Sequence, residues 1–292
     1  MHLTPVDRIA DVVSHPLLAT FAERLLPSDD NRPYYDTRLN GVGSLMPYHT
    51  HVNTRVVVDA LNHLIDQAAQ GHAVFHEFYP AIRKNEDSAR RRTGLIFYRG
   101  KLGAPFAIIC PGGGFVYVGT LHEGLPIASA ISKKGLNAFV LRYRIGEAMA
   151  TEDLAIATAF VLENADELGV DRNGYSLWGA SAGARMVGNA VLNGVRLGGT
   201  GNLPRPAAVV IAYTGQAAWS EDFPPAFIIV SADDPIANVA TVERRVESLK
   251  RAGVEVEYHK YARAGHGFGL GVGTEAEGWV EDAIRFWIAH RP

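Results

Sequence analysis

From residue 73 to residue 292 the chain alternates short apolar runs with longer segments of helical periodicity. The short runs are rich in β-branched and aromatic residues and are bounded by Gly, Pro and Asp, as strands usually are. Alternation of this kind predicts a mostly parallel sheet with helices on both faces, an α/β fold. The predicted strands are residues 73–79, 94–99, 105–110, 136–144, 175–179, 207–214, 226–232 and 254–261.

Helical signals fill most gaps between these strands. No helix is predicted between residues 73–79 and 94–99, so these two strands should pair antiparallel at one edge of the sheet. A capping-box pattern from Thr120 to Glu123 predicts the start of a helix that ends at Lys134. Further helices are predicted over residues 151–168 with Thr151 as the cap, directly after Ser181, and over about 237–252 and 276–289.

The first 72 residues lack this alternation. Residues 55–70 have the spacing of an amphipathic helix, whereas residues 27–53 are rich in Pro, Asn, Tyr, His and Gly and show no periodicity. We interpret residues 1–72 as an arm laid on a core of residues 73–292. The whole chain, 1–292, is then one domain, within the size range that α/β domains occupy.

Charge and cysteine content exclude several classes of protein. The net charge is −3, from 28 basic and 31 acidic residues, so no positive field would attract nucleic acid. No run approaches 18 uninterrupted apolar residues and no signal-peptide pattern is present, so no membrane span is expected. The single cysteine, Cys110, ends an apolar run and has no partner within the chain, so we expect a small core residue in a cytoplasmic protein.

One serine, Ser181, lies between two glycines and two alanines in the stretch GASAG, directly after a predicted strand. One interpretation is a turn in which Gly179 and Gly183 merely let a helix pack closely on the sheet. The other is a nucleophile elbow, in which a strained turn exposes the serine Oγ. The second interpretation requires a histidine to take the hydroxyl proton and a carboxylate to orient that histidine.

Both partners follow later predicted strands. Asp233 and Asp234 come after residues 226–232, and His266 lies in a glycine-rich segment after residues 254–261. The chain order Ser, acid, His, with each group at the carboxyl end of a strand, is the order that a nucleophile elbow requires. Taken singly, the acids could form an Asx-turn or a helix cap, and the histidine could be an ordinary loop residue.

The glycine-rich stretch CPGGGFVYVG follows the predicted strand 105–110. Three glycines let the backbone turn its amides toward a ligand, so we predict an oxyanion hole from the N–H groups of Gly113, Gly114 and Ala182. A phosphate-binding loop is the competing explanation, but the Lys and Ser/Thr of a P-loop are missing from this stretch. Three nearby aromatic residues either line the site or belong to the core: Phe115, Tyr117 and Trp178.

The motifs PGGGF, GASAG, SADDPI and GHGFG, in this order, resemble the α/β-hydrolase superfamily. Over about residues 73–290 the chain is most similar to the esterase/lipase group that includes acetyl-xylan-esterase-like and feruloyl-esterase-like enzymes. The resemblance implies that Ser181 is the nucleophile, that His266 is the general base and then acid, and that Asp233 orients it. Asp234 would then face away or cap the next helix. Pro111 stands where the family usually has a histidine before the glycines, so no histidine braces the loop from that place.

These features together suggest a serine carboxylic-ester hydrolase that works through an acyl-enzyme on a small-molecule ester. We expect short acyl groups, acetyl first, carbohydrate esters as candidate substrates, and neither a metal nor an organic cofactor. The same three residues would also serve a peptidase, a thioesterase or a lactonase. A hydrolase-fold protein that binds a small ligand without catalysis is a further alternative, and the sequence pattern sets no oligomeric state.

The arm is the one long segment that could cover such a site. Residues 215–225, between two predicted strands, are too few to form a helical cap. Long aperiodic segments are often functional, and residues 27–53 could form a lid that binds a polar alcohol. Alternatively, the arm only covers the edge of the sheet. The residues suited to contact a sugar are Tyr34, Tyr35, Asn40, Tyr48, His49 and His51.

Overall fold

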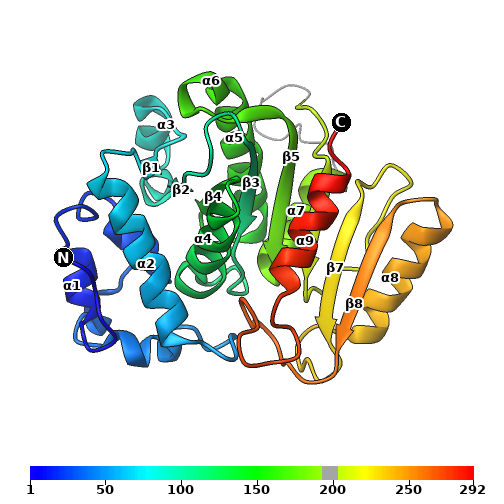
Figure 1. The fold of residues 1–292 in the computed structure, drawn as a ribbon, viewed down its shortest axis with the longest axis horizontal. Coiled ribbons are helices and arrows are strands. Elements are labelled where there is room, and N and C mark those ends of the chain that lie inside the picture. The colour runs from blue at the N-terminus through cyan, green and yellow to red at the C-terminus, as the bar shows by residue number, and fades with distance from the viewer. Residues whose placement is uncertain (193–202) are drawn as a thin grey trace.

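The computed structural model describes residues 1–192 and 203–292. Within these residues eight strands form one sheet in the order β1-β2-β4-β3-β5-β6-β7-β8 (Figure 1). The strands are β1 (Phe75–His76), β2 (Gly94–Tyr98), β3 (Pro105–Cys110), β4 (Asn137–Arg142), β5 (Asp171–Ala180), β6 (Ala208–Ala212), β7 (Ala226–Ser231) and β8 (Val256–Tyr261).

The sheet is mostly parallel, as the alternation of apolar runs predicted. Strands β1 and β2 pair antiparallel, β2 pairs antiparallel with β4, and every other neighbouring pair is parallel. Strands β3, β4, β6 and β7 are buried along their whole length because helices cover both faces of the sheet. The carboxyl ends of the parallel strands meet at the lower edge of the sheet in Figure 1.

Helices α2, α4 and α9 lie on one face of the sheet, and α5 and α7 pack against each other on the opposite face (Figure 1). The described helices are α1 (Ile9–Val13), α2 (Thr54–Ala69), α3 (Ala81–Glu86), α4 (Leu125–Lys133), α5 (Glu147–Glu163), α6 (Ala165–Leu168), α7 (Ala182–Leu192), α8 (Val239–Arg251) and α9 (Trp279–Ala289). None of them is long and apolar enough to cross a membrane.

Several sequence-based boundaries differ from the structure, and β5, predicted over residues 175–179, spans Asp171–Ala180. The first strand is only two residues long, because the chain leaves the sheet after His76. The helix predicted to begin at Thr151 begins at Glu147 instead, after Gly146 with a φ of 103°. Thr151 therefore lies inside α5, where its hydroxyl donates to the carbonyl of Glu147 at 2.8 Å and caps nothing.

The capping box from Thr120 to Glu123 is also wrong. Residues Thr120–Gly124 form a wide π-type turn, and α4 starts only at Leu125. The Glu123 carboxylate accepts a hydrogen bond from the backbone N–H of Gly112, 11 residues earlier, rather than from its own helix start. The Thr120 N–H donates to the Val118 carbonyl instead, and a local pattern cannot reveal a partner 11 residues away.

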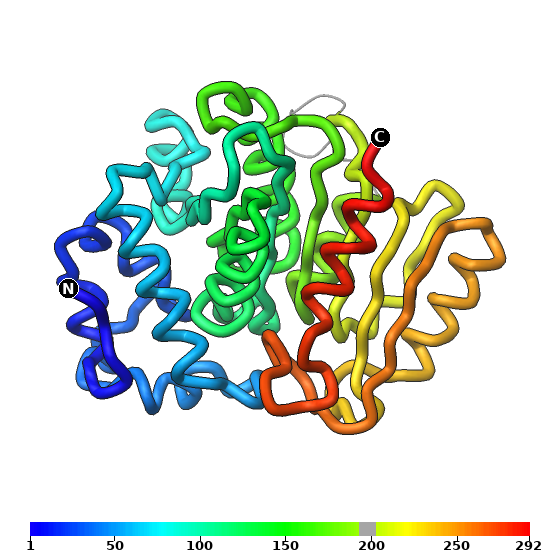
Figure 2. The backbone as a smooth tube through the Cα atoms, viewed as in Figure 1, coloured from blue at the N-terminus to red at the C-terminus, as the bar shows by residue number. Residues whose placement is uncertain are grey.

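The N-terminal arm packs into the same hydrophobic core as the sheet. Its helix α1 and short 3₁₀ turns contribute side chains that are buried among those of α2 and the sheet. Figure 2 shows the blue chain before α2 running to the orange-red loop that follows β8. The buried arm residues include Ile9, Val12, Leu18, Phe21, Leu25, Leu26, Leu39, Val42 and Met46.

Because the arm shares this core, truncating an arm side chain should destabilise the whole protein. Leu39 in the arm and Leu141 in β4 are both fully buried. Replacing either by Ala should lower the free energy of unfolding by about 2–5 kcal/mol. Urea unfolding followed by circular dichroism should show one transition for both variants. A Leu39→Ala variant as stable as wild type would show that the arm is only loosely attached.

Candidate active site

Ser181 lies at the turn between strand β5 and helix α7, as the sequence predicted. Its φ of 51° falls in the left-handed region, which residues other than glycine rarely adopt. Such a conformation costs about 1–3 kcal/mol and persists only where the surrounding structure enforces it. The strained turn predicted for a nucleophile elbow is therefore present at this serine.

The flanking glycines are required by close backbone contacts. A Cβ on Gly183 would lie 1.9 Å from the carbonyl oxygen of Cys110 at the end of β3. A Cβ on Gly179 would lie 2.4 Å from the Cα of Ala184 in α7. Any side chain at either place would push α7 away from the sheet. The two glycines thus allow the packing that holds Ser181 in its strained conformation.

His266 reaches Ser181 from the loop that follows β8. Its Nε2 lies 2.8 Å from the Ser181 Oγ, and the residue is almost fully buried. Gly265 and Gly267, with φ values of 67° and 65°, let the loop turn sharply on both sides of the histidine. The ring of Tyr213 packs against the imidazole edge to face, with the ring centroids 5.3 Å apart. The predicted pairing of this serine with this histidine is present in the structure.

The acid beside His266 is Asp234, not the predicted Asp233. The Asp234 Oδ2 lies 2.8 Å from the His266 Nδ1, and its Oδ1 lies 3.0 Å from the same nitrogen. The Asp234 side chain is fully buried. Its Oδ1 also accepts the backbone N–H groups of Ile236 and Ala237, which anchor the carboxylate in the turn after β7.

Asp233 instead stabilises the backbone of the histidine loop. Its Oδ1 accepts hydrogen bonds from the Ser231 hydroxyl and from the N–H of Gly265, 2.5 and 2.9 Å away. These donors, the hydroxyl first, lower the pKa of the Asp233 carboxyl below its usual value. Adjacent residues in a turn point in different directions, so the motif alone identified the pair of acids but chose the wrong member.

The glycine-rich loop after β3 packs directly on the serine turn. A Cβ on Gly112 would lie 2.8 Å from the Cβ of Ser181. Gly113, Gly114 and Phe115 have φ values of 129°, 64° and 59°, three successive residues with positive φ. Ala182 is the first residue of α7, so its N–H has no partner within the helix.

A cleft of about 320 Å³ opens above Ser181 and His266. Gly114 and Ala182, two of the three residues predicted for the oxyanion hole, line it, whereas Gly113 is buried behind the loop surface. Of the three aromatic residues in question, Phe115 lines the cleft, while Trp178 packs between Trp279 and Trp287 in the core and Tyr117 lies behind the loop. The remaining lining residues are Glu147, Arg185, Tyr213, Thr214, Gly215, Gln216, Ile236 and Ala237.

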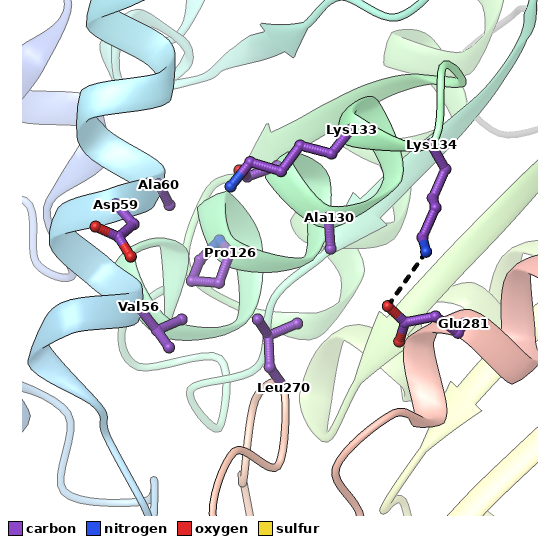
Figure 3. A pocket seen from close by; sticks show the side chains of 10 residues that line it. Val56, Asp59, Ala60, Pro126, Ala130, Lys133, Lys134, Leu270 and Glu281 are labelled. Atoms are coloured by element: carbon purple, nitrogen blue, oxygen red, sulfur yellow. Dashed lines mark ion pairs between the residues drawn. The ribbon is translucent and has the colours of Figure 1, made fainter.

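A second hollow of about 370 Å³ lies between α2, α4 and the segment that leads into α9 (Figure 3). Its only ion pair among the residues drawn joins Lys134 and Glu281, 3.7 Å apart. None of Ser181, His266 and Asp234 lines this hollow, so it is separate from the cleft above the serine. Within residues 1–192 and 203–292, no group of three or more His, Cys, Asp or Glu side chains is placed to hold a metal ion.

Comparison with solved structures gives the fold. An acetyl ester-xyloside bifunctional hydrolase from Caldicellulosiruptor lactoaceticus superposes with a TM-score of 0.59 and 20% identity, over 68% of this chain and 88% of that one. Esterase 2 from Thermogutta terrifontis gives 0.59 and 19%, over 68% and 89%. A carboxylesterase from Lactobacillus plantarum gives 0.57 and 20%, over 67% and 92%. The chain has the α/β-hydrolase fold.

Similarity in sequence to known proteins is limited. No family model matches the chain. A segment of 93 residues is 30% identical to endo-1,4-beta-xylanase B from Butyrivibrio fibrisolvens and covers 30% of this chain. The matched segment spans only 14% of that xylanase.

The contacts of the two adjacent acids predict that replacing Asp by Asn lowers kcat far more at position 234 than at position 233. Asp234→Asn should lower kcat for p-nitrophenyl acetate by about 10³–10⁴-fold, because an amide cannot hold His266 in the required tautomer. Asp233→Asn keeps an oxygen that accepts from Ser231 and Gly265, so kcat should fall by less than about tenfold. Steady-state kinetics on both variants measure the difference. A larger loss in Asp233→Asn would contradict the assignment of Asp234.

Proposed function

We propose that the protein is a serine hydrolase of carboxylic esters that acts through a covalent acyl-enzyme. The observation that carries the proposal is that the serine, the histidine and the aspartate lie within hydrogen-bond distance of one another in that order. The Ser181 Oγ lies 2.8 Å from the His266 Nε2, and the His266 Nδ1 lies 2.8 Å from the Asp234 Oδ2. Nucleophile, base and orienting acid are therefore within hydrogen-bond reach before any substrate binds.

In this mechanism His266 accepts the Ser181 proton as Oγ attacks the ester carbonyl carbon. The carbonyl oxygen becomes negatively charged and is stabilised by the N–H groups of Gly113 or Gly114 and of Ala182. The tetrahedral intermediate then collapses, the alcohol leaves with the proton from His266, and the acyl group stays on Ser181. Water repeats the sequence, with His266 again acting first as base and then as acid, and releases the carboxylic acid.

Asp234 contributes by its position rather than by taking the proton. Its buried carboxylate accepts the Nδ1–H of His266, so the Nε2 lone pair faces Ser181. When His266 becomes positively charged, the same carboxylate stabilises the imidazolium. The two backbone amides on Asp234 keep it in place, so little reorganisation is needed during the reaction.

We further propose short acyl groups, acetyl first, and a polar alcohol such as a carbohydrate. The cleft is small, and its lining combines apolar residues such as Phe115 and Ile236 with polar ones. An ion pair of 2.8 Å between Arg185 and Glu147 borders it, with Thr214 and Gln216 nearby. The names of two similar proteins, an acetyl ester-xyloside hydrolase and a xylanase, point to the same substrate class.

Peptides, thioesters and lactones are alternative substrates for the same three residues. A ligand-binding protein without catalysis is less well supported, because such proteins usually lack one member of the triad and all three are in contact here. The single cysteine, Cys110, is buried, which fits the cytoplasmic location that we propose.

The proposal predicts that Ser181→Ala loses hydrolysis of p-nitrophenyl acetate by about 10⁴-fold or more, because the nucleophile is gone. The matched control is Ser176→Ala, which removes a buried hydroxyl of the same strand β5 that donates to the Ala208 carbonyl at 2.8 Å. That variant should keep activity within about threefold of wild type. Circular dichroism should show both variants folded, and a fully active Ser181→Ala would refute the proposal.

The same assay separates the substrate classes. Wild type should hydrolyse p-nitrophenyl acetate faster than the octanoate, and it should release acetate from an acetylated sugar. Faster cleavage of a thioester, a lactone or a p-nitroanilide at equal concentration would favour the corresponding alternative. Loss of each activity in Ser181→Ala assigns it to this site.

A further inference from the structure

A buried carboxylate, Glu123, lies directly behind the glycine-rich loop and takes no part in the mechanism above. It is 0% exposed and lies in the wide turn before α4. Its Oε2 accepts the N–H of Gly112 at 2.5 Å, and its Oε1 accepts the hydroxyl of Tyr213 at 2.8 Å. Both partners border catalytic groups, because Gly112 precedes the predicted oxyanion glycines and the Tyr213 ring packs on His266.

The third partner of Glu123 comes from the N-terminal arm. The Nε2 of His49 lies 3.1 Å from the Glu123 Oε2, and both side chains are almost fully buried. The His49 Nδ1 lies 2.8 Å from the Tyr117 hydroxyl, which also accepts the N–H of Tyr48 at 3.0 Å. If that hydroxyl donates to Nδ1, the proton of His49 must be on Nε2, facing the carboxylate.

The partners of Glu123 oppose the effect of burial on its carboxyl. Burial alone would raise the pKa of its carboxyl, but His49 and the Gly112 amide outweigh burial and lower the pKa to about 2. The contacts of Glu123 thus favour the ionised form of its carboxyl. The Gly112 N–H donates to this carboxylate, which anchors the glycine-rich loop to the turn before α4.

The same arm segment also holds the histidine loop. The Thr50 hydroxyl donates to the carbonyl of His266 at 2.7 Å, and the Thr50 N–H donates to the same carbonyl at 3.0 Å. Three consecutive arm residues, Tyr48, His49 and Thr50, thus contact the glycine-rich loop and the loop that carries His266. Yet the residues that line the cleft include none from the arm.

A glycine loop needs such support if it is to form an oxyanion hole. Three successive residues of this loop have left-handed φ values, and glycines leave the backbone free to adopt other conformations. Donors stabilise the transition state only when they are already placed about 2.7–3.1 Å from the developing oxyanion.

We propose that Glu123 and His49 are positioning residues that hold the oxyanion loop in its active conformation. This inference rests on the proposed esterase function and assigns the arm a role in transition-state stabilisation rather than that of a lid. Gly112 is anchored by Glu123, so the following amides stay directed at the site of the oxyanion. The His49 imidazole contacts the same carboxylate and connects it to the arm.

The test compares Glu123→Gln and His49→Gln with wild type, using p-nitrophenyl acetate and the inhibitor benzyl trifluoromethyl ketone. The ketone accepts Ser181 Oγ at its carbonyl carbon, His266 takes the serine proton, and the carbonyl oxygen becomes an oxyanion. Glu123→Gln should lower kcat by about 10–100-fold with KM changed by less than about threefold. The ketone Ki should rise by the same factor as kcat falls.

Tyr213→Phe is a milder variant that removes only the hydroxyl on Glu123 Oε1, and kcat should fall by about 3–10-fold. Its matched control is Tyr79→Phe, which removes a buried hydroxyl from Asp153 at 2.7 Å, away from the cleft. Tyr79→Phe should lower the melting temperature to a similar extent and leave kcat and the ketone Ki unchanged. If Glu123 had a purely structural role, Tyr213→Phe and Tyr79→Phe would have the same effect on kcat and on the ketone Ki.

Unchanged kcat and ketone Ki in folded Glu123→Gln and Tyr213→Phe would overturn the proposal, as would an effect on KM alone. The experiment also distinguishes failure of this proposal from failure of the proposed esterase function. If wild type hydrolyses no ester, the rate at which a fluorophosphonate labels Ser181 still depends on the oxyanion loop. That rate should fall in Glu123→Gln and stay constant in Tyr79→Phe. Equal labelling rates in all three proteins would also overturn the proposal.

Discussion

The left-handed backbone at Ser181 is the constraint on which the rest of the site depends. With a φ of 51°, the serine lies at the end of β5 with its Oγ 2.8 Å from the His266 Nε2. The conformation is unfavourable by itself and is imposed by contacts that only glycines permit at positions 179 and 183. Because α7 then approaches the end of β3, the loop that follows β3 is brought against the serine.

The sheet order brings the other groups to the same place. Strands β7 and β8 run parallel to β5, so the loops after them, with Asp234 and His266, emerge at the same edge. Loops are the least rigid part of such a fold, and here the arm contacts the loop after β3 through His49 and the loop after β8 through Thr50. The arm shares the hydrophobic core, so it is a firm support for both loops.

Sequence patterns were sufficient where the signal is local or repeated. The mostly parallel sheet follows from the alternation of apolar runs and helical segments, and the serine turn and the histidine after the last strand follow from short motifs at strand ends. The choice between Asp233 and Asp234 could not be made this way, since it depends on how a turn directs two neighbouring side chains. Glu123 was mistaken for a helix cap because its real partners, Gly112, His49 and Tyr213, lie 11, 74 and 90 residues away. Such long-range polar contacts leave no periodic signal in the sequence.

The central claim is that Ser181, activated by His266 and Asp234, is the nucleophile. The most direct measurement is to treat the protein with a fluorophosphonate and to map the adduct by tandem mass spectrometry after proteolysis. The account predicts a single phosphonyl group on Ser181, formed much more slowly when His266 is replaced by Ala. A protein that stays unlabelled, or an adduct on any other residue, would contradict it.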